Sequence, residues 1–228
     1  ADDKGKTLSK EDIRLVIETT NAVVKAEKEK TMTSVDEAKT IVDKLSDGTL
    51  KDNLLDRLEQ VVLSIVTANS KDVSEGLLNY LKIENVNHDY MNEYQNAIND
   101  YNITSKQDIQ NVIDAVNGLI AAIIDWTEDN ISALEKVKNN LRVSAFKTTV
   151  SKYVNVLKND RNAMNTFDDG ALNSANSTID SLDNSHYKEL INPSQNALNK
   201  LLSAKIDLNK ASKDDAQTAI NKMAKSKV

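Results

Sequence analysis

The sequence contains no cysteine, one proline, five glycines and few aromatic residues. Without cysteine, neither a disulfide nor a thiolate zinc site can form. Hairpin turns depend on glycine and proline, and strands favour aromatic and β-branched side chains. A chain this poor in turn formers and aromatics is not rich in strands, so the composition predicts an all-α protein.

Long hydrophobic runs and blocks of basic residues are also missing. The longest apolar run, around residues 119–124, is closed by Asp125 and is far shorter than the roughly 20 residues that cross a bilayer. The net charge is −6, and the acidic and basic residues are interleaved, with no Lys/Arg block that would follow a phosphate backbone. We therefore expect no membrane span and no nucleic-acid partner.

Motifs for catalysis or ligand chemistry are absent from the sequence. The two histidines, His88 and His186, stand in polar surroundings without a second histidine or a carboxylate at ligand spacing. The glycines are isolated, so no phosphate-binding loop is predicted, and the acidic pairs at 168–169 and 214–215 lack the spacing of a calcium loop. We expect no enzyme activity, no catalytic residue, no metal site and no cofactor.

The stretch from Thr104 to Trp126 has the clearest helical pattern in the chain. Ser105 and Asp108 have the spacing of a helix-capping pair, which predicts a helix start. The apolar residues that follow recur every three or four positions and predict one buried face. They are Ile109, Val112, Ile113, Val116, Leu119, Ile120 and Ile123.

Similar start signals recur along the chain. The serines that open them are Ser9, Ser34, Ser70 and Ser212, three of which have an acidic residue three positions later. Asn192 followed by Pro193 predicts a further helix start. The first predicted helix carries an apolar pattern at Ile13, Val16, Ile17, Val23 and Val24, and Asp47-Gly48 predicts the end of the second. Residues 131–157 show a helical pattern that fits one helix or two.

The organisation of the chain follows from these signals. We predict tandem bundles of the three-helix type forming an elongated helical array, with a flexible tail at residues 1–7 and modules at 8–84, 85–165 and 166–228. The segments that begin at Ser9, Ser34, Ser105 and Ser212 share adjacent apolar residues at their eighth and ninth positions. Either internal duplication or the general requirements of capped amphipathic helices explain that likeness.

Tyrosines are concentrated on one predicted helix. Tyr90, Tyr94 and Tyr101 fall on a common helical face. Such rings pack at the edge of a core with their hydroxyls in water, and they are also common in binding surfaces. The three tyrosines are therefore either core-edge residues or a binding strip.

Two phrases carry a resemblance to a known class of proteins. AKTIVDKLSDGTLKDNLLDRLEQV, residues 38–61, and YQNAINDYNITSKQDIQNVIDAVNGLIAAI, residues 94–123, resemble the helical repeat modules of secreted Gram-positive (Firmicute) surface-layer and adhesin-type proteins. The resemblance implies a secreted or cell-surface location. It also implies a non-catalytic role as a spacer or as a unit that binds a wall polymer or a host protein.

Two other functions remain open from the sequence. The apolar run from Gly118 to Ile124 suggests a component of a helical pore-forming toxin, although Asp125 and the short length argue against it. The tyrosine strip suggests an inhibitor that binds another protein.

Overall fold

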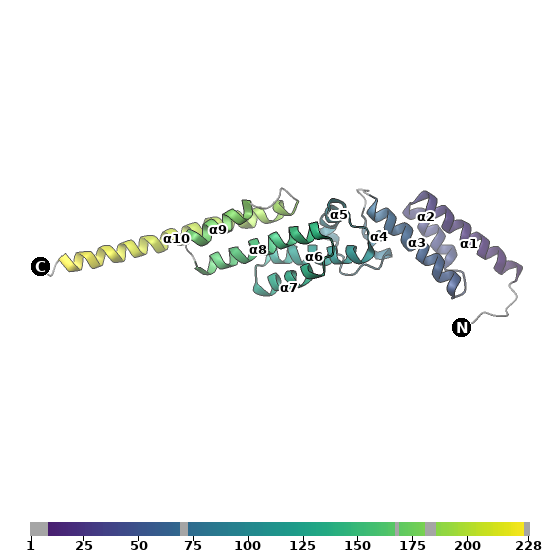
Figure 1. Ribbon diagram of the computed structural model, residues 1–228, viewed down its shortest axis with the longest axis horizontal. Helices are drawn as coiled ribbons and strands as arrows, with labels where there is room; N and C mark the ends of the chain where they lie inside the picture. The colour runs from purple at the N-terminus through teal and green to yellow at the C-terminus, as the bar shows by residue number, and fades with distance from the viewer. Residues whose placement is uncertain (1–8, 69–72, 167–168, 181–185, 226–228) are drawn as a thin grey trace. The chain divides into compact units, whose positions relative to one another are not determined.

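The computed structural model describes residues 9–68, 73–166, 169–180 and 186–225 (Figure 1). Within these residues the chain forms helices joined by turns, and none of them lies in a strand. The predicted all-α class and the packing of the helices into bundles are confirmed.

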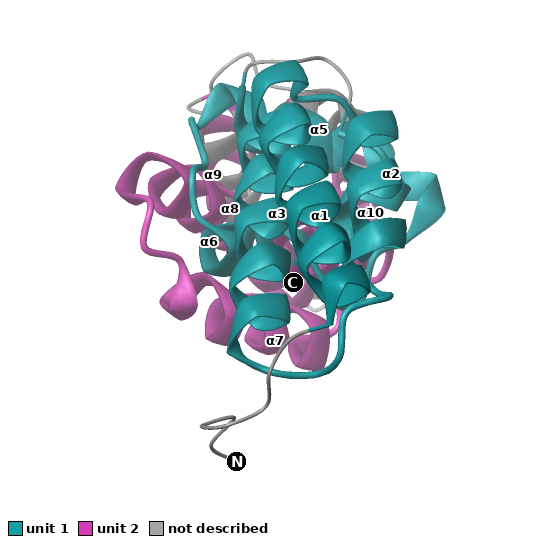
Figure 2. Cartoon of the chain, turned by 90° about the vertical axis from the view of Figure 1, so that its right-hand side faces the viewer, with its two compact units in different colours: residues 1–113 teal, residues 114–228 magenta. Residues whose placement is uncertain are grey.

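The chain divides into two compact units, residues 1–113 and residues 114–228 (Figure 2). The boundary falls inside one helix, α6 (Lys106–Ile124), whose first half belongs to unit 1 and whose second half belongs to unit 2. The division into three modules at 8–84, 85–165 and 166–228 stays a prediction.

Unit 1 begins with a three-helix bundle whose helices are joined by short connections. These helices are α1 (Lys10–Glu29), α2 (Met32–Val42) and α3 (Thr49–Thr67). The start predicted at Ser9 is confirmed, because the Ser9 hydroxyl accepts from the Asp12 N–H at 3.0 Å and the Asp12 carboxylate accepts from the Ser9 N–H at 2.9 Å. Arg57 of α3 binds Glu27 of α1 through two hydrogen bonds of 2.8 Å, which ties the two helices together.

The rest of unit 1 consists of shorter elements and the first half of α6. They are α4 (Glu75–Tyr80), the 3-10 helix η1 (His88–Tyr90) and α5 (Met91–Asp100). The start predicted at Ser70 lies outside the described residues, and Ser74 caps α4 by accepting from the Leu77 N–H at 3.3 Å. The Gln110 amide of α6 exchanges two hydrogen bonds with the backbone of Glu84, of 2.8 and 3.1 Å, which fixes α6 against the loop after α4.

Unit 2 continues from α6 with a longer set of helices. They are α7 (Glu128–Asn140), α8 (Ser144–Thr166), α9 (Asp169–Asp180) and α10 (His186–Lys225). The pattern at residues 131–157 therefore belongs to two helices, separated where the backbone of buried Leu141 is extended. Helix α8 packs against α7, α9 and α10.

Two of the predicted helix starts are wrong, because both lie inside α10. It runs without a break through Pro193 and through Ser212, where the sequence signals predicted that new helices begin. A serine with an acid three residues later caps a helix only where the backbone before it is not already helical. The shared start serines are therefore not equivalent in the structure, since Ser9 and Ser105 precede helices whereas Ser212 lies inside one.

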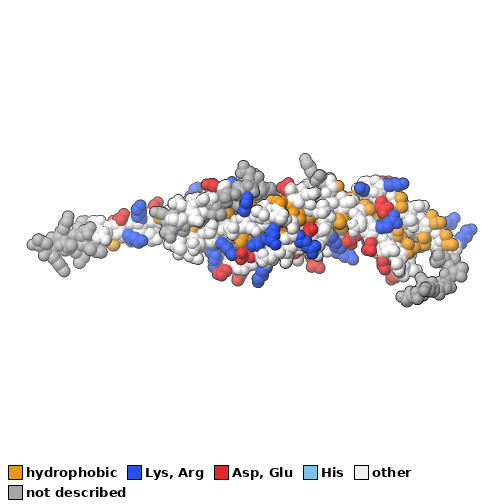
Figure 3. Space-filling model, viewed as in Figure 1, with side chains coloured by type: hydrophobic (Ala, Val, Ile, Leu, Met, Phe, Trp, Pro, Cys, Tyr) orange, Lys and Arg blue, Asp and Glu red, His pale blue; other side chains and the backbone are white. Residues whose placement is uncertain are grey.

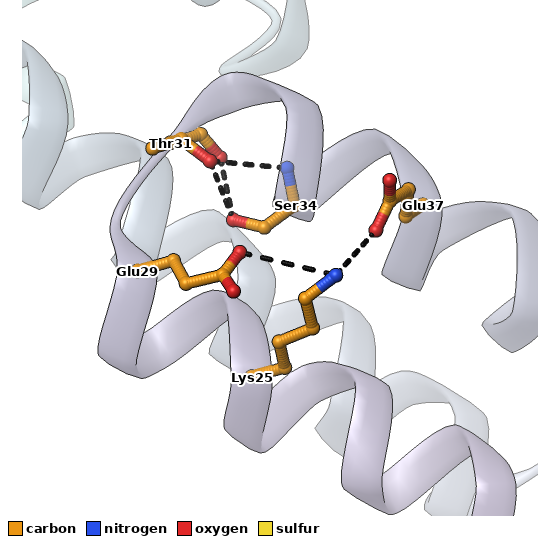
Figure 4. Close-up of polar contacts among 5 residues, drawn as sticks. All are labelled: Lys25, Glu29, Thr31, Ser34 and Glu37. Carbon is orange, nitrogen blue, oxygen red and sulfur yellow. Dashed lines mark hydrogen bonds and ion pairs between the residues drawn. The ribbon is translucent and has the colours of Figure 1, made fainter.

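The start of α2 also differs from the prediction, which placed a capping box at Ser34 and Glu37. The helix starts three residues earlier, and Thr31 is its cap: the Thr31 hydroxyl accepts from the Ser34 N–H at 3.2 Å (Figure 4). Buried Ser34 donates its hydroxyl to the Thr31 carbonyl at 2.9 Å, while Glu37 instead accepts from Lys25 of α1 at 2.8 Å. Likewise α2 ends at Val42, and Gly48 precedes α3 rather than closing α2.

The apolar face of α6 is confirmed at every predicted position, because all seven residues are buried. The face predicted for α1 is only partly correct. Val23 is buried, but Ile13 and Ile17 are 48% and 56% exposed, and the buried side of the helix is formed by Thr19, Val23 and Ala26. The residues of α1 that the core buries therefore lie on a different side of the helix from Ile13 and Ile17.

The observed cap of α2 can be tested by paired substitutions. We expect Thr31→Ala to lower the free energy of unfolding by about 1 kcal/mol, because a helix N-terminal N–H loses its acceptor. Thr33→Ala is the matched control: Thr33 is exposed inside α2, and alanine there is neutral or stabilising by a few tenths of a kcal/mol. Urea unfolding measures both, and equal effects at the two positions would contradict the assignment of the cap.

Candidate functional site

The three tyrosines of the predicted strip lie on or next to α5 but differ in accessibility. Tyr94 is 0% exposed, and its hydroxyl accepts a hydrogen bond from the Asn87 N–H at 3.1 Å. The Tyr90 ring packs edge-on against the Tyr94 ring, with centroids 6.5 Å apart and planes at 79°. Tyr90 and Tyr101 are half-buried. Tyr94 is thus a core residue, and any binding surface here consists of Tyr90 and Tyr101; their role in binding stays a prediction.

Substitution distinguishes the structural tyrosine from its neighbour. We expect Tyr94→Ser to destabilise unit 1 by about 3–5 kcal/mol, because it removes a fully buried ring. Tyr90→Ser, at a half-buried position, is expected to cost about 1 kcal/mol, including the lost ring contact. Thermal unfolding followed by circular dichroism measures both, and a fully stable Tyr94→Ser protein would contradict the assignment of Tyr94 to the core.

Tyr80, at the end of α4, is a perturbed tyrosine that the sequence pattern did not single out. Burial raises the pKa of its hydroxyl to about 12, and the negative charges of Asp36, Asp43 and Glu59 act in the same direction. These carboxylates come from α2, the turn after it and α3, so only the folded chain brings them around Tyr80. No sequence spacing signals this arrangement.

The raised pKa of Tyr80 predicts a pH dependence at the alkaline end. In the unfolded chain this hydroxyl ionises near pH 10, so its contribution to stability is complete below that pH and is lost as the pH rises towards 12. We expect ultraviolet titration of the wild type to show a component ionising near pH 12 that Tyr80→Phe removes. Titration curves of the two proteins that coincide above pH 11 would contradict it.

A groove between α7 and α8 is the concave surface that we take as the candidate binding site. Its volume is about 420 Å³. Each helix contributes four residues at the spacing of one helical face, positions i, i+3, i+4 and i+7. The lining residues are Glu128, Ile131, Ser132 and Glu135 from α7, and Lys158, Arg161, Asn162 and Asn165 from α8.

Ion pairs across the two helices organise this groove. The Lys158 ammonium lies 2.8 Å from the Glu135 carboxylate, and the Arg161 guanidinium lies 3.3 Å from the Glu128 carboxylate. Arg161 also donates to the carbonyl of Trp126 at 3.1 Å, which fixes its direction. The hydrogen bond from Lys158, together with the charges of Lys158 and Lys138, lowers the pKa of Glu135. The lowered pKa keeps Glu135 ionised at neutral pH.

The chemistry of the groove suits a polar, uncharged ligand. Its cations and anions are matched across the two helices, so the lining has no excess charge of either sign. Ser132, Asn162 and Asn165 supply hydroxyl and amide groups that donate and accept hydrogen bonds, and buried Ile131 adds an apolar surface. Among the lining residues no nucleophile lies beside a histidine base.

The apolar run from Gly118 to Ile124 is mostly part of the core of unit 2. Leu119, Ile120, Ala122 and Ile123 are buried, whereas Ile124 is 74% exposed. In the part of the chain that the structure describes, no helix combines the length and the hydropathy that a bilayer span requires. Insertion of this run into lipid would require these side chains to leave the packed interior.

The structure describes the side chain of one of the two histidines. His88 has a carboxylate partner that the sequence spacing did not predict: its Nδ1 lies 3.0 Å from the Glu75 carboxylate, although His88 is highly exposed. The His186 side chain lies outside the described residues. Among the side chains that are described, no group of three histidine, aspartate or glutamate residues is placed to hold a metal ion.

The chain matches no protein-family model, no curated protein and no solved structure in the comparisons with known proteins.

Proposed function

We propose that this protein is a non-catalytic, extracellular helical surface or scaffold module that serves as a spacer and binds a cell-wall polymer or a host protein. The resemblance of residues 38–61 and 94–123 to modules of secreted Gram-positive surface proteins suggests this role. The observation that carries the binding part of the proposal is the polar groove between α7 and α8.

The groove supports binding of a wall polymer because of the groups that line it. Polymers of the cell wall present many hydroxyl and amide groups and few apolar surfaces. Asn162, Asn165 and Ser132 offer complementary hydrogen-bonding groups on rigid helices, and the flanking ion pairs fix the walls of the groove. A ligand held in this way needs no chemical step, which agrees with a module that attaches or displays.

The spacer part of the proposal is supported by the path of the chain. Modules that act as spacers are better served by a helical connection than by a loose linker. Here the boundary between the two units falls inside α6, so a helix and not a loop joins them.

The proposal is tested by retention on candidate ligands. We expect the purified chain to be retained by Gram-positive cell-wall sacculi or by immobilised host matrix proteins. We expect Asn162→Ala with Asn165→Ala to weaken retention on sacculi about thirtyfold, because two hydrogen bonds of about 1 kcal/mol each are lost. Asn155→Ala is the matched control, since Asn155 is exposed on the same helix outside the groove.

Two outcomes would overturn the proposed function. Absence of retention on both sacculi and host matrix proteins would remove the binding role. Leakage of liposomes treated with the purified chain would favour the pore-forming alternative instead, because a spacer has no reason to permeabilise lipid. Thermal unfolding of the groove variants serves as the check that they remain folded.

A further inference from the structure

Helix α1 has a second apolar strip in addition to the one that faces the core. The core strip consists of Thr19, Val23 and Ala26. Ile13, Ile17, Thr20 and Val24 recur at spacings of four, three and four, which also places them along one line of the helix. At 3.6 residues per turn this second strip lies about 120° around α1 from the core strip. We call it the outer strip.

The outer strip is open to solvent, and α3 extends it. Ile13 and Ile17 are 48% and 56% exposed, and Thr20 and Val24 are half-buried. Leu50, in the first turn of α3, is 44% exposed. Figure 3 shows hydrophobic side chains gathered on the surface over α1.

The position of Leu50 follows from the ion pair between α1 and α3. Leu50 lies two helical turns before Arg57 on the same side of α3, and Arg57 is bound to Glu27 of α1. Short connections make α2 antiparallel to both neighbours, so α1 and α3 run in the same direction. Thr20 of the outer strip lies two turns before Glu27 on α1. Leu50 of α3 is therefore at the same height along the bundle as the outer strip.

A row of basic residues borders the outer strip on the side away from α3. Lys10, Arg14 and Lys28 are exposed, and within the described residues none of them makes an ion pair. Lys10 and Arg14 lie three residues before Ile13 and Ile17, respectively, and Lys28 follows Val24 by four. Lys25 and Arg57, by contrast, are both paired with carboxylates.

Single exposed isoleucines are ordinary on protein surfaces, but an aligned apolar strip with an unneutralised basic edge has the composition of a helix-binding surface. We propose that the outer strip and Leu50 dock an amphipathic helix of a partner protein, whose acidic edge faces Lys10, Arg14 and Lys28. This inference rests on the protein-binding form of the proposed function. From Ile13 to Val24 the strip is about 16 Å long, and Lys10 and Lys28 lie about 27 Å apart along the helix, so a partner helix that reaches all three cations needs about five turns.

The basic edge also decides against a second copy of this chain as the partner. Antiparallel pairing of two α1 helices that sets Ile13 against Ile17 brings the two Arg14 side chains close to each other. Parallel pairing places the two basic edges on opposite sides of the interface, so neither edge meets an acidic edge of the other copy. The antiparallel arrangement places like charges together and the parallel one brings the cations no acidic partner edge, whereas the acidic edge of a partner helix gains from each contact.

The test uses two synthetic helical peptides of 21 residues with the same leucine and isoleucine stripe. One carries glutamate along the edge of the stripe, and the other carries lysine there. Fluorescence anisotropy with the full chain is expected to show binding of the glutamate-edged peptide at least tenfold tighter than that of the lysine-edged peptide. The difference is expected to shrink with added salt, because the charges are exposed.

Three variants make the test specific. Lys10→Glu, Arg14→Glu and Lys28→Glu together are expected to reverse the preference between the two peptides, and Ile13→Ser with Ile17→Ser to abolish binding of both. Lys44→Glu with Lys82→Glu, which changes exposed charges elsewhere in unit 1, is expected to leave the preference unchanged. All the substituted side chains are exposed, so thermal unfolding should change little.

The proposal is overturned if the two peptides bind equally, if neither binds, or if charge reversal leaves the preference unchanged. Self-association of the wild type that Ile13→Ser with Ile17→Ser removes would also overturn it, by showing that the strip joins copies of this chain. These results are separate from retention on sacculi, which depends on the groove of unit 2. Failure of the docking site therefore leaves the polymer-binding function standing, and the reverse also holds.

Discussion

The apolar face of α6 is the constraint on which the rest of the structure depends. Ile109, Val112 and Ile113 are buried in unit 1, while Val116 and Leu119 are buried in unit 2. Each such side chain contributes about 1.5–3 kcal/mol when it leaves water, so one helix supplies buried apolar residues to both cores. The helical period aligns these residues along α6, which lets both units form on one uninterrupted element.

The sequence predicted α6 completely and α1 only in part, and the difference has a physical cause. In α6 the apolar residues form one stripe, so the period determines which side is buried. In α1 there are two stripes, and only packing against α2 and α3 decides which of them enters the core. Capping signals were limited in the same way: Ser9 has an extended backbone and caps α1, while the similar Ser212 lies within α10. A local capping signal permits a helix to start, but tertiary packing decides whether a helix starts there.

The candidate groove could not be predicted from the sequence, although the helices that form it could. The residues of its two walls lie about thirty positions apart in the sequence. Taken alone, the residues of each wall resemble the ordinary solvent-exposed face of an amphipathic helix. What makes them a site is the match of Glu128 with Arg161 and of Glu135 with Lys158, which depends on the register of α7 against α8. The burial of Tyr94 and the raised pKa of Tyr80 have the same origin, since contacts between elements produce both.

Ile13 and Ile17 contribute little to the stability of the isolated bundle. A β-branched residue lowers helix propensity by a few tenths of a kcal/mol, and a side chain left about half exposed gains only part of the burial energy. Polar residues with straight side chains at these positions would favour α1 and reduce the exposed apolar surface. The cost is offset if a partner helix buries both isoleucines, because each then contributes fully and the neighbouring cations gain acidic partners. The same residues that weaken the bundle alone thereby strengthen the complex, which is the energetic pattern expected of a docking surface.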